Sequence, residues 1–135
     1  MKNLIITAVI ERLDDVLNFV NEILDTMNCP LKVQMQINIA VEEIYVNIAH
    51  YAYGREQGEA EIIVRTFDDP KAVEIDFKDK GKYFDPLAKP DPDTTLTAEE
   101  RDIGGLGILM IKKSMDDVTY KYRDGQNILT IRKNF

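Results

Sequence analysis

Apolar residues recur with two different periods along this chain. Across residues 11–28 they return at every third or fourth position, which is the spacing of one helix face: Leu13, Val16, Leu17, Val20, Ile23, Leu24 and Met27. Across residues 72–79 they alternate with polar residues, and a strand places the apolar set on one face: Val73, Ile75 and Phe77. The chain is therefore predicted to contain both helices and strands.

Three more segments have the composition of strands. Residues 2–10 and 59–67 are rich in β-branched residues, and an Asp-Asp-Pro turn follows the second of them. Residues 116–135 have the pattern of a hairpin that turns at the sequence DGQN. These segments predict strands whose sequence neighbours pair mostly as hairpins.

The segment LKVQMQINI fits two kinds of structure. Its strict alternation favours a strand, whereas Leu31, Met35 and Ile39 lie four residues apart and share one helix face. Proline is also common in the first turn of a helix. We predict one helix from about Pro30 to Tyr51, with Gly54 as its cap.

Residues 80–104 show no sustained periodicity and contain three prolines, so we expect a long loop there. A short helix over residues 108–115 follows it. The resulting order is strand, helix, helix, strand, strand, loop, helix, strand, strand. It predicts an α+β two-layer sandwich, with helices on one face of a mostly antiparallel mixed sheet. A length of 135 residues suits a single domain over residues 1–135.

Composition narrows the function classes. The hydrophobic fraction is 44% and the charged fraction is 30%, as in ordinary globular proteins. Seventeen basic residues stand against 24 acidic ones, and the net charge of -7 argues against direct nucleic-acid binding. No apolar run approaches the ~20 residues of a membrane span, and one cysteine with one histidine cannot form a Cys/His zinc site. We expect a cytoplasmic protein with no membrane attachment.

The sequence GGLG, residues 104–107, comes just before an apolar helix. Glycine lets backbone amides approach a phosphate closely, and a helix N-terminus adds free N–H donors. Glycines at such a place also form plain tight turns. The pattern is neither the P-loop nor the dinucleotide fingerprint, because no Gly-Lys-Ser/Thr follows and the helix leads into a hairpin.

Two other patterns carry candidate chemistry. Glu43 and Asn47 lie four residues apart on the predicted long helix, where they are either hydrated at the edge of the core or positioned as base and Mg2+ ligand. Asp79 and Gly81 follow a strand, where they form either a common turn or a site for an exocyclic amine such as that of adenine.

All three patterns together resemble the GHKL superfamily, the ATP-binding domain of gyrase, the heat-shock chaperone, histidine kinases and mismatch-repair proteins. The likeness covers essentially the whole chain and is greatest to the anti-sigma-factor serine/threonine kinases, whose branch shares the form DKGKYFDP. It implies the Bergerat ATP-binding fold, with ATP and Mg2+ as cofactors and an ATP lid at about residues 87–103.

The resemblance also implies roles for individual residues. Glu43 is the expected catalytic base or water-orienting carboxylate, and Asn47 is the expected Mg2+ ligand. Asp79 is expected to bind the adenine amino group. The remaining positions implied to contact the nucleotide are Tyr51, Gly81, Phe84, Gly104, Gly105, Leu106, Gly107 and Thr130. Many relatives carry a basic residue where this chain has Tyr51, so His50 is expected to be structural.

Two functions follow from the resemblance. The first is a serine/threonine protein kinase that phosphorylates a small antagonist protein and so controls sequestration of a sigma factor. The second is a non-catalytic ATP/ADP-binding regulatory module that acts by binding its partner. Relatives often dimerise through the sheet, which makes a homodimer an expectation as well.

Overall fold

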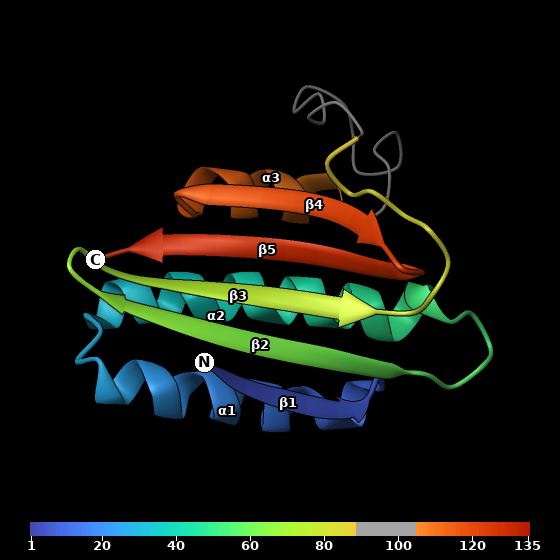
Figure 1. The fold of residues 1–135 in the computed structure, drawn as a ribbon, viewed down its shortest axis with the longest axis horizontal. Coiled ribbons are helices and arrows are strands. Elements are labelled where there is room, and N and C mark those ends of the chain that lie inside the picture. Colours follow the sequence, from blue (N-terminus) through green and yellow to red (C-terminus); the bar gives the residue numbers. More distant parts are fainter. Residues whose placement is uncertain (89–104) are drawn as a thin grey trace.

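One antiparallel sheet has the strand order β1-β2-β3-β5-β4 (Figure 1). The computed structural model describes residues 1–88 and 105–135. Within them the strands are β1 (Lys2–Thr7), β2 (Glu59–Asp68), β3 (Lys71–Asp79), β4 (Asp117–Arg123) and β5 (Gln126–Asn134). Every neighbouring pair of strands in the described sheet is antiparallel. The parallel pairing that a mixed sheet would contain is therefore not found among the described strands.

The helices lie together on one face of this sheet (Figure 1). They are α1 (Leu13–Thr26), α2 (Leu31–Asn47) and α3 (Gly105–Ser114). A 3-10 turn, η1 (Ile10–Arg12), precedes α1, and a π-helical turn, η2 (Ile48–Ala52), continues α2. This arrangement confirms the predicted α+β two-layer sandwich.

The core fills the space between the helices and the sheet. The strands contribute Ile62, Val64, Ile75 and Phe77, and the helices contribute fully buried side chains that include Val20, Leu24, Ile37, Val41 and Tyr45. Burial of each large apolar side chain stabilises the fold by roughly 1.5–3 kcal/mol. The Tyr45 hydroxyl donates to Val9 O over 2.7 Å, which ties the last turn of α2 to the connection between β1 and α1. The sheet thus holds α2 in a fixed position.

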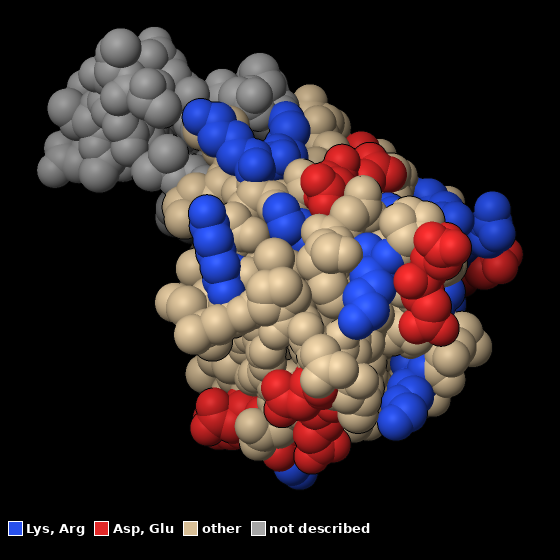
Figure 2. Space-filling view, turned by 90° about the vertical axis from the view of Figure 1, so that its left-hand side faces the viewer, with Lys and Arg blue, Asp and Glu red and all other residues tan. Residues whose placement is uncertain are grey.

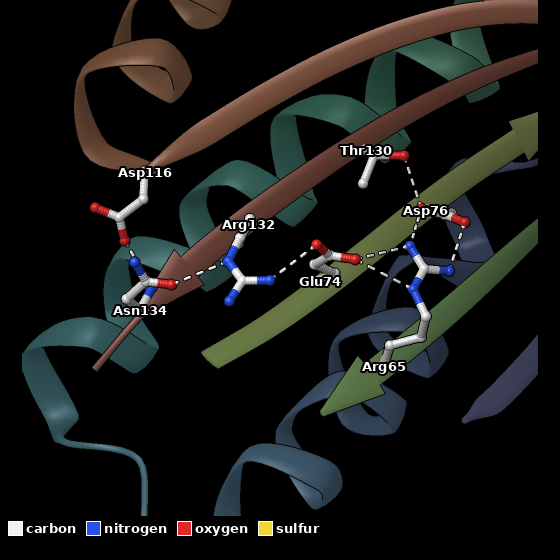
Figure 3. A network of polar contacts seen from close by, with 7 residues as sticks. All are labelled: Arg65, Glu74, Asp76, Asp116, Thr130, Arg132 and Asn134. Carbon is white, nitrogen blue, oxygen red and sulfur yellow. Dashed lines mark hydrogen bonds and ion pairs between the residues drawn. The ribbon is translucent and has the colours of Figure 1, made fainter. Parts of the chain in front are cut away.

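The opposite face of the sheet carries a polar network (Figure 3). Arg65 donates two hydrogen bonds to Asp76, over 2.8 and 2.7 Å, and a third to Glu74. Arg132 also donates to Glu74, over 3.0 Å, and Thr130 donates to Asp76 over 2.7 Å. Burial alone would raise the pKa of Asp76, but these hydrogen bonds and the Arg65 charge outweigh it and hold that pKa below its usual value.

Several boundaries differ from those predicted. The first strand ends at Thr7, because Val9 and the η1 turn lead directly into α1. The long helix does reach Ala52, but its last turn is π-helical, and Gly54 follows with a φ of 61°. α3 begins at Gly105, so two of the three glycines lie inside the helix.

The C-terminal hairpin turns where the sequence predicted. Asp124 and Gly125 have φ values of 53° and 74°, the pair of positive angles that a tight two-residue hairpin requires. In the described part of the chain, no helix has both the length and the apolar character needed to cross a membrane.

Candidate functional site

The C-terminal half of α2 presents a carboxylate and an amide one turn apart. Asn47 Nδ2 donates to Glu43 Oε1 over 3.3 Å, and both side chains are partly buried. Glu42, the neighbour in sequence, is exposed on another side of the helix. The spacing of four residues therefore places this polar pair together on one face of the helix, as the sequence predicted.

The start of α3 lies directly against this pair. A Cβ added to Gly107 would come within 2.0 Å of Glu43 Oε1, so only glycine fits beside the carboxylate in its present position. This contact brings the glycine motif to the Glu43–Asn47 motif. Gly105 begins α3, and the side chain of Leu106 lies outside the described part of the structure. Gly104 and most of the expected lid, residues 89–103, also lie outside it.

Asp79 ends β3 with its side chain directed into the molecule and only 7% exposed. Its Oδ1 accepts hydrogen bonds from Gly81 N over 2.9 Å and from Asn127 Nδ2 over 3.0 Å. Burial raises the pKa of Asp79, and these two hydrogen bonds only partly oppose that rise. Within residues 1–88 and 105–135, no donor reaches its second oxygen, Oδ2. A buried acceptor of this kind is suited to a ligand that brings an N–H group.

The turn after Asp79 is fastened to the end of the long helix. Lys82 N donates to Ala52 O over 2.9 Å, and a Cβ on Gly81 would come within 2.1 Å of the same carbonyl oxygen. Next to Ala52, the Tyr53 hydroxyl accepts a hydrogen bond from Lys80 N over 2.8 Å. The π-helical turn thus joins the Asp79 motif to the helix that carries Glu43 and Asn47. Such turns occur frequently at functional sites.

Asn127 is a residue of the candidate site that the sequence analysis missed. It is 7% exposed and pairs with Asp79 across the β3–β5 ladder. Its Nδ2 donates to Asp79 Oδ1 and to Lys82 O, and its Oδ1 accepts from Phe84 N and from the Tyr120 hydroxyl. A signal was present, because inward-facing Leu129 and Ile131 imply that Asn127 also points inward.

The side chains of three predicted residues do not join the candidate site. Thr130 was expected to support the adenine site, but its hydroxyl binds Asp76 on the face of the sheet that no described helix covers (Figure 3). Tyr51 is exposed, and its ring stands edge-on to that of His50 at 5.8 Å. The Phe84 ring is also exposed, although its backbone N–H reaches Asn127.

The residues present fit both predicted cofactors. Asp79 Oδ2 is available to accept from an adenine amine, and Gly81 and Gly107 keep the backbone clear of Cβ atoms. Asn47 Nδ2 donates a hydrogen bond to Glu43, and no donor among the described residues reaches Asn47 Oδ1. This neutral oxygen is therefore available to Mg2+. No group of three or more His, Cys, Asp or Glu side chains in the described regions could hold a metal by itself. Bound Mg2+ would thus take further oxygens from water and phosphate.

Two curated proteins are similar to part of this chain. The chain is 32% identical over 98 residues to a protein named serine-protein kinase RsbW from Listeria monocytogenes serovar 1/2a. It is 33% identical over 97 residues to one of the same name from Bacillus pumilus. These matches cover 69% and 68% of this chain, and 61% and 60% of the two relatives. The chain thus matches less than two thirds of their length.

The fold also recurs in a solved structure. A chain in the crystal structure of the SiaB–SiaC complex from Pseudomonas aeruginosa superposes with a TM-score of 0.58 at 15% identity, over 98% of this chain and 89% of that one. At this identity the likeness concerns the fold alone. Residues 6–133, which include all of the described site, match the family described as the histidine kinase-like ATPase domain. The chain belongs to this family.

Proposed function

We propose that this protein is a Mg2+- and ATP-dependent serine/threonine kinase of the anti-sigma-factor type. It phosphorylates a small antagonist protein and thereby controls whether a sigma factor is sequestered. One observation carries the proposal: three separate motifs meet at the end of α2, where Gly107 touches Glu43 and Gly81 touches Ala52. The names of the relatives, which are serine-protein kinases, support the choice of reaction.

Asp79 supplies recognition of the base. Its Oδ2 accepts a hydrogen bond from the adenine amine, while Oδ1 stays bound to Gly81 N and Asn127. Guanine carries an oxygen at the corresponding position, which would face a carboxylate and be repelled. The geometry around Asp79 therefore favours ATP over GTP.

Glu43 and Asn47 supply the chemistry at the other end. Asn47 Oδ1 would help to hold a bound Mg2+, which would supply positive charge beside the phosphates. Glu43 accepts the proton of the acceptor serine hydroxyl. At the same time the serine oxygen forms a bond to the γ-phosphorus, and the bond from that phosphorus to the ADP oxygen breaks. Because Gly107 has no Cβ, it leaves room for the carboxylate of Glu43 on the side of α3.

Substitutions matched in chemistry test the proposal. The measurements are Mg-ATP affinity and phosphate transfer to an antagonist-type protein from the same genome. Asp79→Asn should abolish nucleotide binding, because the charge-assisted hydrogen bond is lost. Asp76→Asn is its control, since Asp76 lies on the same strand but faces the opposite side.

The same measurements separate catalysis from binding. Glu43→Gln should bind Mg-ATP and transfer no phosphate, whereas the exposed neighbour Glu42→Gln should behave like the parent. Asn47→Ala should lose the dependence of nucleotide affinity on Mg2+. Unchanged nucleotide affinity in Asp79→Asn would refute the site. A parent protein that binds ATP but transfers no phosphate would instead be a non-catalytic regulatory module.

A further inference from the structure

The first half of α2 displays a row of apolar side chains to the outside. Leu31, Met35 and Ile39 are 73%, 57% and 52% exposed, and their spacing of four residues places them on one side of the helix. The buried side of α2 is a different one, formed by Ile37, Ala40, Val41, Ile44 and Tyr45. The row is therefore no part of the core, although it looks like a core stripe in the sequence.

A groove runs beside this row, between α2 and α1. It has a volume of about 470 Å3, and Leu31, Met35 and Ile39 form its apolar wall. Amide side chains from both helices form the rest: Asn21 and Asn38 exchange hydrogen bonds of 2.9 and 2.8 Å, and Gln34 donates to Asn21 over 2.9 Å. Because these amides satisfy one another, they hold the two helices apart at a fixed spacing and leave the groove preformed.

The α1 side of the groove carries one carboxylate, that of Asp25, whose Oδ1 accepts a hydrogen bond from Gln34 Nε2 over 3.2 Å. Helix α1 carries four acidic residues and no basic one, and Asp25 lines the groove itself. Asp14, Asn18, Asn21 and Asp25 follow one another at helical spacing along that side. Figure 2, which views the end of the molecule where α1 ends and α2 begins, shows acidic side chains gathered at the height of α1 below an uncharged area.

We propose that this groove binds an amphipathic helix of a partner protein that carries lysine or arginine along one edge of its apolar face. The apolar face of that helix packs on Leu31, Met35 and Ile39, in the way that helices enter hydrophobic grooves through residues three and four apart. Its basic edge lies over Asp25 and the acidic side of α1. The surface is separate from the nucleotide site, and the proposal does not depend on phosphate transfer.

The charge of α1 favours a basic helix over a second copy of the chain as the occupant of the groove. Two copies meeting through this groove would bring two acidic α1 helices together, in a chain whose net charge is already -7. Like charges facing each other across an interface oppose association. A basic helix removes that repulsion and gains attraction as well.

The test uses a library of synthetic amphipathic peptides of about 18 residues, or five helical turns. Leucines are fixed at helical spacing, and the positions at the two edges vary among Lys, Glu and Gln. Peptides are selected on the intact protein, and their affinity is measured by fluorescence anisotropy for the parent and for variants. Met35→Ser removes the centre of the apolar row. Ile5→Ser is its control, because Ile5 is 55% exposed on the sheet, away from the groove.

The selected peptides should carry Lys on one edge, and their binding should weaken as salt is added. Met35→Ser should reduce affinity about tenfold or more, as loss of a central apolar anchor does, while Ile5→Ser should not. Asp25→Asn should reduce affinity for the Lys peptides but not for Gln peptides. The proposal fails if no peptide binds, if neutral or acidic peptides bind as well, if both serine variants bind equally, or if Met35→Ser instead abolishes self-association of the protein.

Discussion

Asn127 Nδ2 donates to Asp79 Oδ1 over 3.0 Å, directly across the ladder between β5 and β3. The same amide group also donates to Lys82 O, so one side chain fixes both the carboxylate and the chain that follows it. Asp79 lies at the strand end that the nucleotide base is proposed to approach. Asn127 is therefore positioned to determine the orientation of that carboxylate.

Asn127→Ala should weaken Mg-ATP binding by about tenfold, since a buried hydrogen bond to a charged group is worth roughly 1.5–3 kcal/mol. Titration calorimetry measures this loss, and the apparent pKa of Asp79 should rise further because one opposing hydrogen bond disappears. Thr130→Val is the comparison on the same strand. Its hydroxyl serves Asp76 on the other face, so this variant should keep the parent's affinity. Equal losses in the two variants would contradict the assignment.

Asp79→Asn should make the nucleotide-free protein more stable at neutral pH. The asparagine Oδ1 can still accept from Gly81 and Asn127, while the buried charge is gone. The pKa of Asp79 is raised in the folded state, so its contribution to stability is complete below its ordinary pKa of about 3.9 and is lost as pH rises through the raised value. The advantage of the variant should hence disappear in acid. Thermal unfolding followed between pH 3 and pH 7 measures both effects.

Asp76→Asn is expected to behave in the opposite sense in the same experiment. Its carboxylate is stabilised by Arg65 and Thr130, and its pKa is lowered. That stability is present above the ordinary pKa and is lost as pH falls through the lowered value. The variant should be destabilised most at neutral pH, and the difference should narrow in acid. Two variants that shift with pH in the same direction would refute the opposite environments of these carboxylates.

Local patterns predicted much of the fold. The alternation of Val73, Ile75 and Phe77 gave the buried face of β3 correctly, and the Asp-Gly pair gave the last hairpin turn. The strand face and the hairpin turn each depend on residues close together in the sequence, so a local sequence pattern is enough to predict them. The spacing of Glu43 and Asn47 likewise placed two candidate site residues together, because a helix converts a separation of four residues into one turn.

Contacts between distant segments could not be predicted in this way. Asn127 meets Asp79 only after β5 has paired with β3. The register of that pairing cannot be predicted from the sequence of either strand alone. The apolar row on α2 shows another limit, since periodicity identifies a helix face but not what covers it. The wrong expectation for Thr130 was avoidable. Thr130 lies between inward-facing Leu129 and Ile131, so its side chain must point to the opposite face of the sheet.

Gly107→Ala should separate catalysis from folding. The added methyl group would lie 2.0 Å from Glu43 Oε1, and the flexible carboxylate must turn away to admit it. Alanine stabilises a helix by about 0.5–1 kcal/mol relative to glycine, so α3 should not be weakened. We expect phosphate transfer to fall by about tenfold or more, since misplacement of a reacting group is costly. Met110→Ala, an exposed change on the same helix, should leave transfer unchanged. Full activity in Gly107→Ala would mean that the position of Glu43 does not matter.

Tyr53→Phe should loosen the Asp79 turn while the fold persists. The Tyr53 hydroxyl donates to Glu59 O over 2.5 Å and accepts from Lys80 N over 2.8 Å, linking the π-helical turn to β2 and β3. Burial raises the pKa of this phenol, so it stays protonated and able to donate at neutral pH. Phenylalanine keeps the ring against Gly58 but loses both hydrogen bonds, each worth about 1 kcal/mol net.

Amide hydrogen exchange gives the decisive measurement for this variant. The amide of Lys80 should exchange faster in Tyr53→Phe, and Mg-ATP affinity should fall several-fold because the turn that holds Asp79 is less well ordered. Tyr122→Phe removes a hydroxyl from an exposed tyrosine on β4 and should change neither quantity. If exchange at Lys80 rises while affinity stays the same, the π-helical turn stabilises the fold without positioning Asp79 for the nucleotide. If both change together, Tyr53 links the end of the long helix to the position of Asp79, the carboxylate that is proposed to recognise the base.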